Sequence, residues 1–418
     1  MMERSSSALD LMESPPGPSL VSWNLTRQCN LRCPHCYIDA SATPVEEELS
    51  EEDALGVVDQ LAGLSPGAMV VFSGGEPLLR RDLPDLVRRA ASRRLVPVLG
   101  TNGTLLEDRT LAELATCGLA GIGISLDSPD PAYHDAFRGN KGAWQKAVRA
   151  VEACRDLGLP CQIQTTLARD NLAYVRDVVE LSARLGAMAF NLFFLVCTGR
   201  GESLTDVTPH EYEQALATLA DLQKRFTGLR VRARCAPHFT RIMAEAGNPG
   251  GELPVGCMAG NDYLRLSPEG KVTPCPFLPI VVGDLCQQEL AQVWRDSAVL
   301  RDLREGKWRG RCGACTFSRS CRGCRARAYG VSGSYLEEDP WCTHQPVNGS
   351  GAYPSSGPRW QDDARDRIER VPGFIRQRVM AYVETYARKQ GYTEVTIQIL
   401  EEVKSKRPMA RSILPFRR

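Results

Sequence analysis

Residues 24–40 read NLTRQCNLRCPHCYIDA and hold the pattern that decides the fold. Three cysteines, Cys29, Cys33 and Cys36, follow a short apolar run at C-x3-C-x2-C spacing. Three thiolates at this spacing bind three irons of a cubane cluster and leave the fourth iron open to a small chelating molecule. The alternative is a zinc site, which needs a fourth Cys or His nearby, and His35 is available. The stretch therefore predicts a metal centre at the end of the first strand.

Short apolar runs alternate with amphipathic segments on either side of this stretch. We expect buried strands at residues 21–26, 68–75, 95–103, 120–127, 161–167 and 188–196. Residues 50–64 repeat apolar side chains at helical spacing, with Ser50 placed as the N-cap. Six strand–helix units predict a parallel sheet with right-handed crossovers, and they are too few for a closed eight-stranded barrel. The sequence predicts an α/β fold with a partial (β/α)6 barrel of the TIM type.

Composition divides the 418 residues further. Residues 1–19 are rich in Ser and Pro and predict a disordered tail, and residues 20–240 carry the strand–helix units. Residues 255–346 are rich in Cys and consist mostly of loop signals. The Gly, Ser and Pro content of 347–358 predicts a linker. Residues 359–405 predict a small α/β module with two helices and a strand at 395–400.

Charge and cysteine content exclude several classes of protein. Lys and Arg number 51 against 50 Asp and Glu, so overall charge gives no support to nucleic-acid binding. No apolar run approaches the roughly 20 residues that cross a bilayer, and the N-terminus lacks a signal core, so we expect a cytoplasmic protein without a membrane span. Sixteen cysteines in such a chain predict metal or redox chemistry rather than disulfides.

The chain from about residue 20 to 345 resembles the radical S-adenosylmethionine (SAM) enzymes. The resemblance implies that Cys29, Cys33 and Cys36 hold a [4Fe–4S] cluster whose open iron binds SAM. It also implies one-electron cleavage of SAM to a 5′-deoxyadenosyl radical, with electrons from a low-potential reductant such as ferredoxin or flavodoxin. In this chemistry the protein binds, orients and excludes water, because the cofactor carries the difficult step.

The ends of the next three strands carry residues that fit the same resemblance. In FSGGEP, after the second strand, the glycines let the backbone approach the amino group of SAM, and the glutamate orders the loop. Polar groups at the fourth strand end contact the ribose or carboxylate of SAM in the family. The alternatives are ordinary turns, strand ends and a solvated arginine. The candidate SAM contacts are Gly74, Gly75, Glu76, Pro77, Asn102, Ser125, Asp127 and Arg138.

The later cysteines resemble the SPASM extension of radical SAM enzymes, which holds auxiliary iron–sulfur clusters. The resemblance implies one or two auxiliary [4Fe–4S] clusters, an outer one on Cys312, Cys315, Cys321 and Cys342 and an inner one on Cys257, Cys275 and Cys324. Three ligands leave the inner cluster with an open iron. The family usually has three residues between the last two cysteines of the central group, whereas this sequence has two, Arg322 and Gly323. A zinc ion on the cysteines between 312 and 324 is the alternative.

The six cysteines that remain lie alone, at 117, 154, 161, 197, 235 and 286. We expect them to be small buried hydrophobic residues. Cys235 is the exception, because His238 lies three residues further on and the pair could complete a cluster or reach a metal.

Two resemblances concern the substrate. The segment from Arg359 resembles a small module named for light-independent protochlorophyllide reductase, with the pattern Trp360, Pro372, Phe374, Arg376, Glu384, Ala387 and Gly391. Residues 24–40, FLVCTGRGE (194–202) and the cysteine-rich run to Cys342 resemble radical SAM enzymes of heme d1 and alternative heme synthesis. Together they predict an enzyme that modifies a side chain of an iron porphyrinoid. Candidate partners for its carboxylates are Arg200, Arg325 and Arg327.

Two other functions compete with this prediction. Many SPASM proteins mature ribosomal peptides, but those often carry a recognition domain before the core, and only about 20 residues precede the first strand here. A non-catalytic electron carrier or assembly factor would need no open iron, so the three cysteines and SGGEP argue against it.

Overall fold

A ten-stranded sheet in the order β10-β9-β8-β1-β2-β3-β4-β5-β6-β7 organises the molecule. The structure is a computed structural model that describes residues 17–45, 47–196, 198, 200, 207–246, 256–346, 358–369, 379–380, 383–384, 386–387 and 390–406. Most of the predicted tail and linker, Cys197, and Pro372, Phe374 and Arg376 lie outside the described residues.

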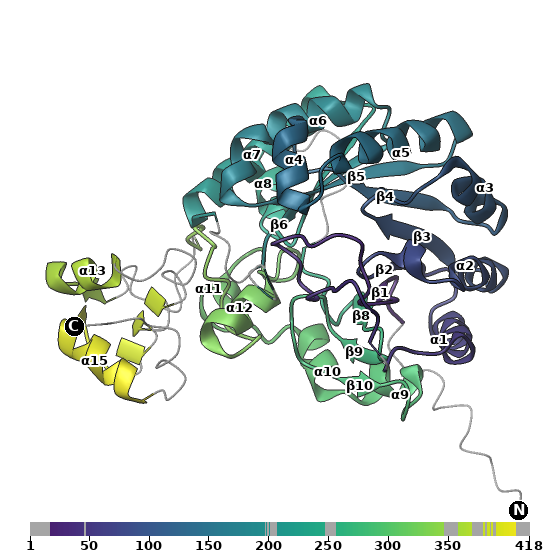
Figure 1. Ribbon diagram of the computed structural model, residues 1–418. Helices are drawn as coiled ribbons and strands as arrows, with labels where there is room; N and C mark the ends of the chain where they lie inside the picture. The colour runs from purple at the N-terminus through teal and green to yellow at the C-terminus, as the bar shows by residue number, and fades with distance from the viewer. Residues whose placement is uncertain are drawn as a thin grey trace, which may run out of the picture.

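The six predicted strands are confirmed, and neighbours pair in parallel in chain order. They are β1 (Leu20–Asn24), β2 (Met69–Ser73), β3 (Val96–Thr101), β4 (Gly121–Ser125), β5 (Cys161–Leu167) and β6 (Ala189–Phe194). Figure 1 shows these strands along an arc with helices on its outer side. The helices are α1 (Glu51–Leu64), α2 (Leu83–Ser92), α3 (Asp108–Thr116), α4 (Pro131–Arg138), α5 (Ala143–Leu157), α6 (Val175–Arg184) and α7 (Pro209–Arg225). Ser50 caps α1, accepting a hydrogen bond from the Asp53 amide.

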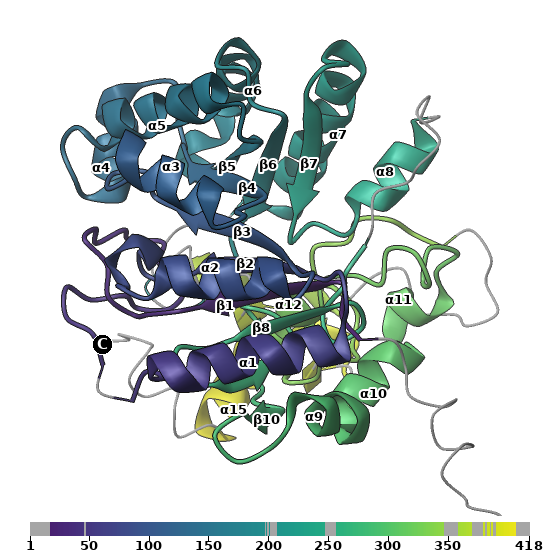
Figure 2. The same ribbon diagram turned by 90° about the vertical axis from the view of Figure 1, so that its right-hand side faces the viewer.

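Two further parallel strands were not predicted. β7 (Arg230–Arg234) pairs with β6, and β8 (Tyr263–Leu266) pairs with β1 from the other side. Antiparallel β9 (Lys271–Thr273) and β10 (Gly283–Asp284) extend that edge, so the cysteine-rich region contributes strands to the sheet of the core. Figure 2 shows β8 beside β1 and α1.

The cysteine-rich residues 255–346 hold more helix and strand than their many loop signals predict. Besides these strands the region holds α9 (Leu290–Asp296), α10 (Ala298–Glu305), α11 (Gly310–Ala314) and α12 (Arg325–Ser332), after α8 (Phe239–Glu245). Each of these elements is at most eight residues long. Such short elements display too few turns for their periodicity to be recognised.

The two faces of the sheet differ in chemistry because side chains alternate along each strand. One face carries Val21, Trp23, Val231 and Leu264, which are buried in the main hydrophobic core with the helices. The opposite face, which we call the inner face, is polar. On this face the strand pairing aligns Gln164 of β5 with Asn191 of β6 and Arg232 of β7. It also aligns Ser22 of β1 with Arg265 of β8.

The C-terminal residues form a module with its own hydrophobic core. β11 (Arg359–Trp360) pairs with β12 (Glu394–Val395), and α13 (Asp362–Glu369) packs with α15 (Ile397–Lys406). The predicted strand at 395–400 was wrong beyond Val395. Ile399 and Val403 lie four residues apart and pack on the same core, so a helical face replaces the apparent alternation.

Candidate active site

The three motif cysteines lie in the loop that follows β1, which we call the cysteine loop (residues 25–40). Burial raises the pKa of the Cys29 thiol to about 11, and charge on Glu76, Cys33 and Cys36 acts in the same direction. The three sulfurs therefore share one environment. The amides of Leu31 and Ala40 lie 3.4 Å from the sulfurs of Cys29 and Cys36. Buried thiols with such donors suit a bound metal cluster, which replaces the proton.

The glycines after β2 approach the cysteine loop itself. The amides of Gly75 and Glu76 donate to the carbonyls of Thr26 and Gln28, each at 2.8 Å. A Cβ on Gly74 would lie 2.6 Å from the Thr26 carbonyl oxygen, and one on Gly75 would overlap the Gln28 carbonyl. The glycines therefore let the end of β2 pack directly on the loop that carries the cysteines.

Glu76 joins the ends of two neighbouring strands, β2 and β3. It is fully buried, and it accepts hydrogen bonds from the Thr101 hydroxyl at 2.8 Å and the amides of Asn102 and Leu78 at 2.9 and 3.2 Å. Burial raises the pKa of Glu76 to about 7 against the influence of these donors. Pro77 begins the short 3-10 helix that Glu76 caps.

Asn102 reaches from the end of β3 into the cysteine loop. Its Nδ2 donates to Oδ1 of Asn30 at 3.0 Å and lies 4.0 Å from the Cys29 sulfur. Asn30 in turn donates to the Thr104 hydroxyl at 2.8 Å. Sequence reasoning missed Asn30 and Thr104, although both lie within two residues of predicted site residues.

Asp127 and Arg138 form a buried pair at the end of β4. Arg138 donates to both carboxylate oxygens, at 2.6 and 3.0 Å, and the Thr166 amide adds a third bond at 2.9 Å. Burial alone would raise the pKa of Asp127, but the positive charge of Arg138 outweighs it and holds the pKa well below its usual range. Nη1 of Arg138 lies 4.0 Å from the Cys33 sulfur. Arg138, a predicted SAM contact, is thus paired with a carboxylate of the protein beside the cysteine loop.

Ser125 and His35 complete the predicted set around the cysteine loop. Ser125 ends β4 on the inner face, aligned with Gln164. The ring of His35 stacks on Phe137 with 4.2 Å between centroids, and burial lowers its pKa to about 3. Among the described residues, no three His, Cys, Asp or Glu side chains converge on a single metal ion. A cubane needs no such convergence, because each thiolate binds its own iron.

Three predicted inner ligands and Cys235 gather beside β7. Burial raises the pKa of Cys275 well above its usual value, with further contributions from Cys257, Cys324 and Cys235. Cys235 and Cys275 pack against Cys324 in one apolar cluster. Cys235 follows β7 with a left-handed backbone (φ 56°), and its carbonyl accepts from Arg327 at 2.9 Å.

The four predicted outer ligands line one pocket. Cys312, Cys315, Cys321 and Cys342 share it with His238, Arg311, Phe317 and His344. Burial raises the pKa of Cys342 to about 12, and Cys312 adds to the effect. The zinc alternative required Cys324 to join this set, but Cys324 does not line this pocket and packs with Cys235 and Cys275 instead. The crossed assignment of the cluster ligands stays a prediction.

Asp339, which sequence reasoning missed, connects the two cysteine groups. It is fully buried and accepts from the Cys324 amide at 2.6 Å, while its own amide lies 3.4 Å from the Cys312 sulfur. Burial opposes ionisation, but the charge of Arg327 dominates and keeps the pKa of Asp339 well below its usual range. The only sequence signal was its place three residues before Cys342.

The three arginines predicted to contact substrate make contacts within the protein. Arg200 donates to the carbonyls of Cys33 at 3.0 Å and Ala40 at 2.8 Å and so braces the cysteine loop. Arg325 donates to the carbonyls of Tyr335 and Glu337. Arg327 binds Asp339 at 3.1 and 3.2 Å and lies over the rings of Tyr212 and Trp341.

In the part of the chain that the structure describes, none of the helices has the length and apolar character that a membrane span requires.

Three segments of the chain match known families. Residues 23–182 match the Radical SAM superfamily, residues 257–325 match an iron-sulfur cluster-binding domain (SPASM), and residues 360–404 match the proto-chlorophyllide reductase 57 kD subunit family. The first two matches imply bound [4Fe–4S] clusters and SAM.

Curated relatives and solved structures extend the likeness. An AdoMet-dependent heme synthase of Methanosarcina barkeri is 37% identical, over 79% of this chain and 97% of its own length. A pre-heme d1 synthase of Dinoroseobacter shibae is 29% identical, over 82% of this chain and 92% of its own length. Streptococcus suis SuiB bound to precursor peptide SuiA shares the fold, with a TM-score of 0.66 and 17% identity over 80% of this chain and 78% of its own. The identity to the heme synthase, spanning nearly all of that protein, shows that this chain belongs to the radical SAM superfamily.

Proposed function

We propose that this radical SAM enzyme modifies a peripheral side chain of an iron porphyrinoid. The observation that carries the proposal is the 37% identity to a heme synthase over 97% of that enzyme's length. The match of residues 360–404 to a protochlorophyllide reductase family supports the same class of substrate independently.

The residues around the cysteine loop fit the cofactors that the family implies. Cys29, Cys33 and Cys36 hold the SAM-binding cluster and leave one iron for the methionine part of SAM. When bound, the cluster and SAM supply a 5′-deoxyadenosyl radical that abstracts a hydrogen atom from the substrate. Asn102 holds the loop through Asn30, and Arg138, fixed by Asp127, places positive charge beside Cys33. Ser125, on the inner face, is free to contact SAM.

The extension holds two auxiliary clusters in this proposal. Cys312, Cys315, Cys321 and Cys342 hold the outer cluster, supported by their shared pocket. Cys257, Cys275 and Cys324 hold the inner one, and Cys235 is its fourth ligand, supported by its packing against Cys275 and Cys324. With Cys235 as a fourth thiolate, the inner cluster would have no open iron, which suits electron transfer rather than direct binding of substrate.

A Cys235→Ser variant tests the fourth ligand. Electron paramagnetic resonance of the reduced protein should show a changed signal for one auxiliary cluster, while the outer cluster signal and the SAM-induced change persist. Cys154→Ser, at a buried cysteine on α5, is the matched control. Identical spectra for the Cys235 variant and wild type would leave the inner cluster with three thiolates.

The substrate is tested by anaerobic incubation of the reconstituted protein with SAM, dithionite and either iron coproporphyrin III or didecarboxysiroheme. Mass spectrometry of all products should show 5′-deoxyadenosine together with an altered macrocycle. A protein that instead modifies a peptide, as the names of the PqqA peptide cyclases 27–28% identical to this chain would suggest, would overturn the proposal.

A further inference from the structure

The inner face carries arginines that the known chemistry does not use. Arg232 and Arg234 lie on β7, and Arg265 lies on β8 at the other side of the parallel strands. Val231 and Leu264, one residue away, are buried in the main core, so the arginines occupy the opposite face by strand alternation. Arg234 is the last residue of β7, level with Phe193 and Thr166 near the strand ends where the cofactor residues lie.

These guanidinium groups have few partners among the described residues. Arg234 donates through Nε to Oδ1 of Asn191 at 3.1 Å, and Arg265 donates through Nε to Oδ1 of Asn24 at 2.6 Å. In this part of the chain the terminal nitrogens of both make no hydrogen bond, and Arg232 makes none at all. No carboxylate of the described residues lies in ion-pair range of the three. The nearest acidic influence on Arg265 is Glu269, which is bonded to Arg27.

β7 and β8, the first and last of the parallel strands across the sheet, bring these charges toward one region. Tyr263 of β8 lies within electrostatic range of both Arg234 and Arg265. Arg232 and Arg234 lie two residues apart on the same face of β7, where both are partly buried, so their positive charges repel each other. Partly buried like charges are costly without an anion, and a bound anion would offset that cost.

We propose that Arg232, Arg234 and Arg265 bind the carboxylates of the substrate and orient it on the inner face of the sheet. The inference rests on the proposed function, and it specifies a polycarboxylate. A single carboxylate would engage one guanidinium, whereas three groups on two strands suit acid groups spread around the rim of a macrocycle. The predicted SAM contacts are other residues, at the ends of β2, β3 and β4 and on α4, so the three arginines are not among them.

The terminal nitrogens of Arg234 and Arg265 provide the bidentate geometry. Asn191 and Asn24 hold the Nε atoms, and these amides are fixed in turn by Gln162 at 2.7 Å and Tyr37 at 2.7 Å. Each guanidinium is thus held at its Nε atom, which leaves its two terminal nitrogens to donate to a carboxylate. Tyr37 belongs to the cysteine loop, so the Arg265 contact also connects substrate binding to the cofactor site.

Anaerobic titration of the full-length, cluster-loaded protein with iron coproporphyrin III, followed at the Soret band, tests the proposal. Arg234→Gln and Arg265→Gln should each weaken binding roughly tenfold to a hundredfold, because each removes a charge-assisted pair. Arg230→Gln is the matched control, since Arg230 lies exposed at the far end of the same strand and face. Its affinity should equal that of wild type.

The tetramethyl ester of the same macrocycle separates a carboxylate contact from a structural role. The ester should bind the wild type weakly and should not distinguish it from the two glutamine variants. Equal affinities of wild type and variants for the free acid would overturn the assignment. The assignment would also be overturned if the glutamine variants changed only the spectroscopic signal of an auxiliary cluster, because the arginines would then balance the charge of that cluster. A wild type that binds no porphyrinoid but modifies a peptide would instead refute the proposed function.

Discussion

Arg322 and Gly323 both have left-handed backbones, with φ of 66° and 58°. They make the tight turn that brings Cys321 to the outer group and Cys324 to the inner group with one residue fewer than the family usually has. At Gly323 a Cβ would lie 2.9 Å from the Cys312 sulfur and from Cβ of Asp339. Position 323 of the turn therefore has no room for a side chain.

Gly323→Ala should impair the outer cluster. The left-handed backbone alone costs about 1–2 kcal/mol for alanine, and the new methyl group displaces a predicted ligand. We expect roughly four irons fewer per chain and a lower melting temperature. Gly330→Ala is the control, since Gly330 is an exposed helical residue with nothing within 4 Å of its Cβ position. Full iron content in the Gly323 variant would refute the predicted role of the turn.

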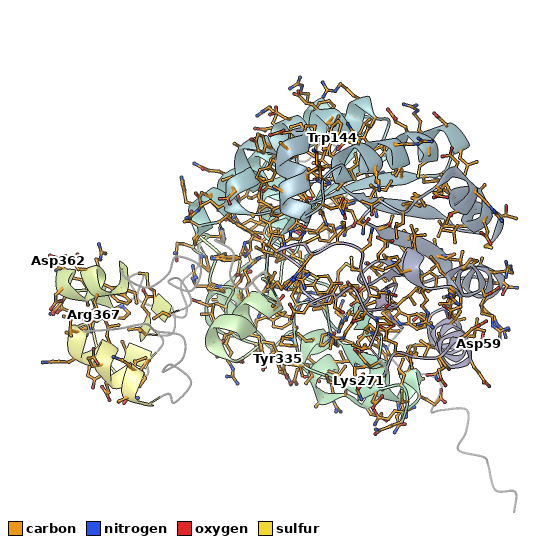
Figure 3. All side chains as sticks on the ribbon, viewed as in Figure 1. Asp59, Trp144, Lys271, Tyr335, Asp362 and Arg367 are labelled. Atoms are coloured by element: carbon orange, nitrogen blue, oxygen red, sulfur yellow. The ribbon has the colours of Figure 1, made fainter. Side chains whose placement is uncertain are left out.

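Asp127→Asn should destabilise the cluster-free protein by about 3–5 kcal/mol, because it leaves the buried Arg138 without its charge partner. Urea unfolding measures this. Asp59→Asn is the control: Asp59 lies on α1 at the surface (Figure 3) and pairs with exposed Arg89 and Arg93, so its loss should matter little. Equal effects of the two substitutions would contradict the buried pair.

At the scale of single residues, the sequence indicated the candidate cysteines but not the partners of the arginines. A C-x3-C-x2-C motif places its thiols within one loop, so spacing was sufficient. Arg325 and Arg327 were predicted as substrate contacts because they flank Cys324. Their real partners, Asp339 and the carbonyls of Tyr335 and Glu337, are brought in by tertiary structure that spacing does not encode.

Among the elements, strands with alternating or wholly apolar side chains could be predicted from the sequence, whereas the strands that contain arginine could not. RVRAR (230–234) and YLRL (263–266) place charged residues on a face that is normally solvated or apolar. Such strands resemble exposed segments when the inner face of the sheet is unknown. The arginines that made β7 and β8 difficult to predict include the three now proposed to bind the substrate, Arg232, Arg234 and Arg265.

The helix that precedes β7 has a capping box that can be tested. Thr208 accepts from the Glu211 amide, and Glu211 accepts from the Thr208 amide at 2.6 Å. Thr208→Ala should cost about 1 kcal/mol in the free energy of unfolding. Thr218→Ala on the same helix, where the hydroxyl bonds only to the Gln214 carbonyl, should change stability less. A reversed order would contradict the cap.

At the scale of the whole molecule, the proposed clusters use three separate groups of cysteines. Replacing Cys29, Cys33 and Cys36 together by Ala should abolish 5′-deoxyadenosine formation, because no open iron remains for SAM. Roughly eight irons per chain, two cubanes' worth, should stay in the extension. Iron and sulfide analysis with a SAM-cleavage assay checks both parts. Stoichiometric zinc in place of iron, or undiminished cleavage, would contradict the assignment.

The pairing of β1 with β8 also has a consequence for synthesis on the ribosome. Leu20 is among the first described residues, and its partner Tyr263 is made more than 240 residues later. Until then the nascent chain has a bare strand edge beside the cysteine loop, and such edges recruit other strands. A fragment that ends before Tyr263 should therefore self-associate, and iron loading should wait until the later half of the chain has emerged and covered that edge.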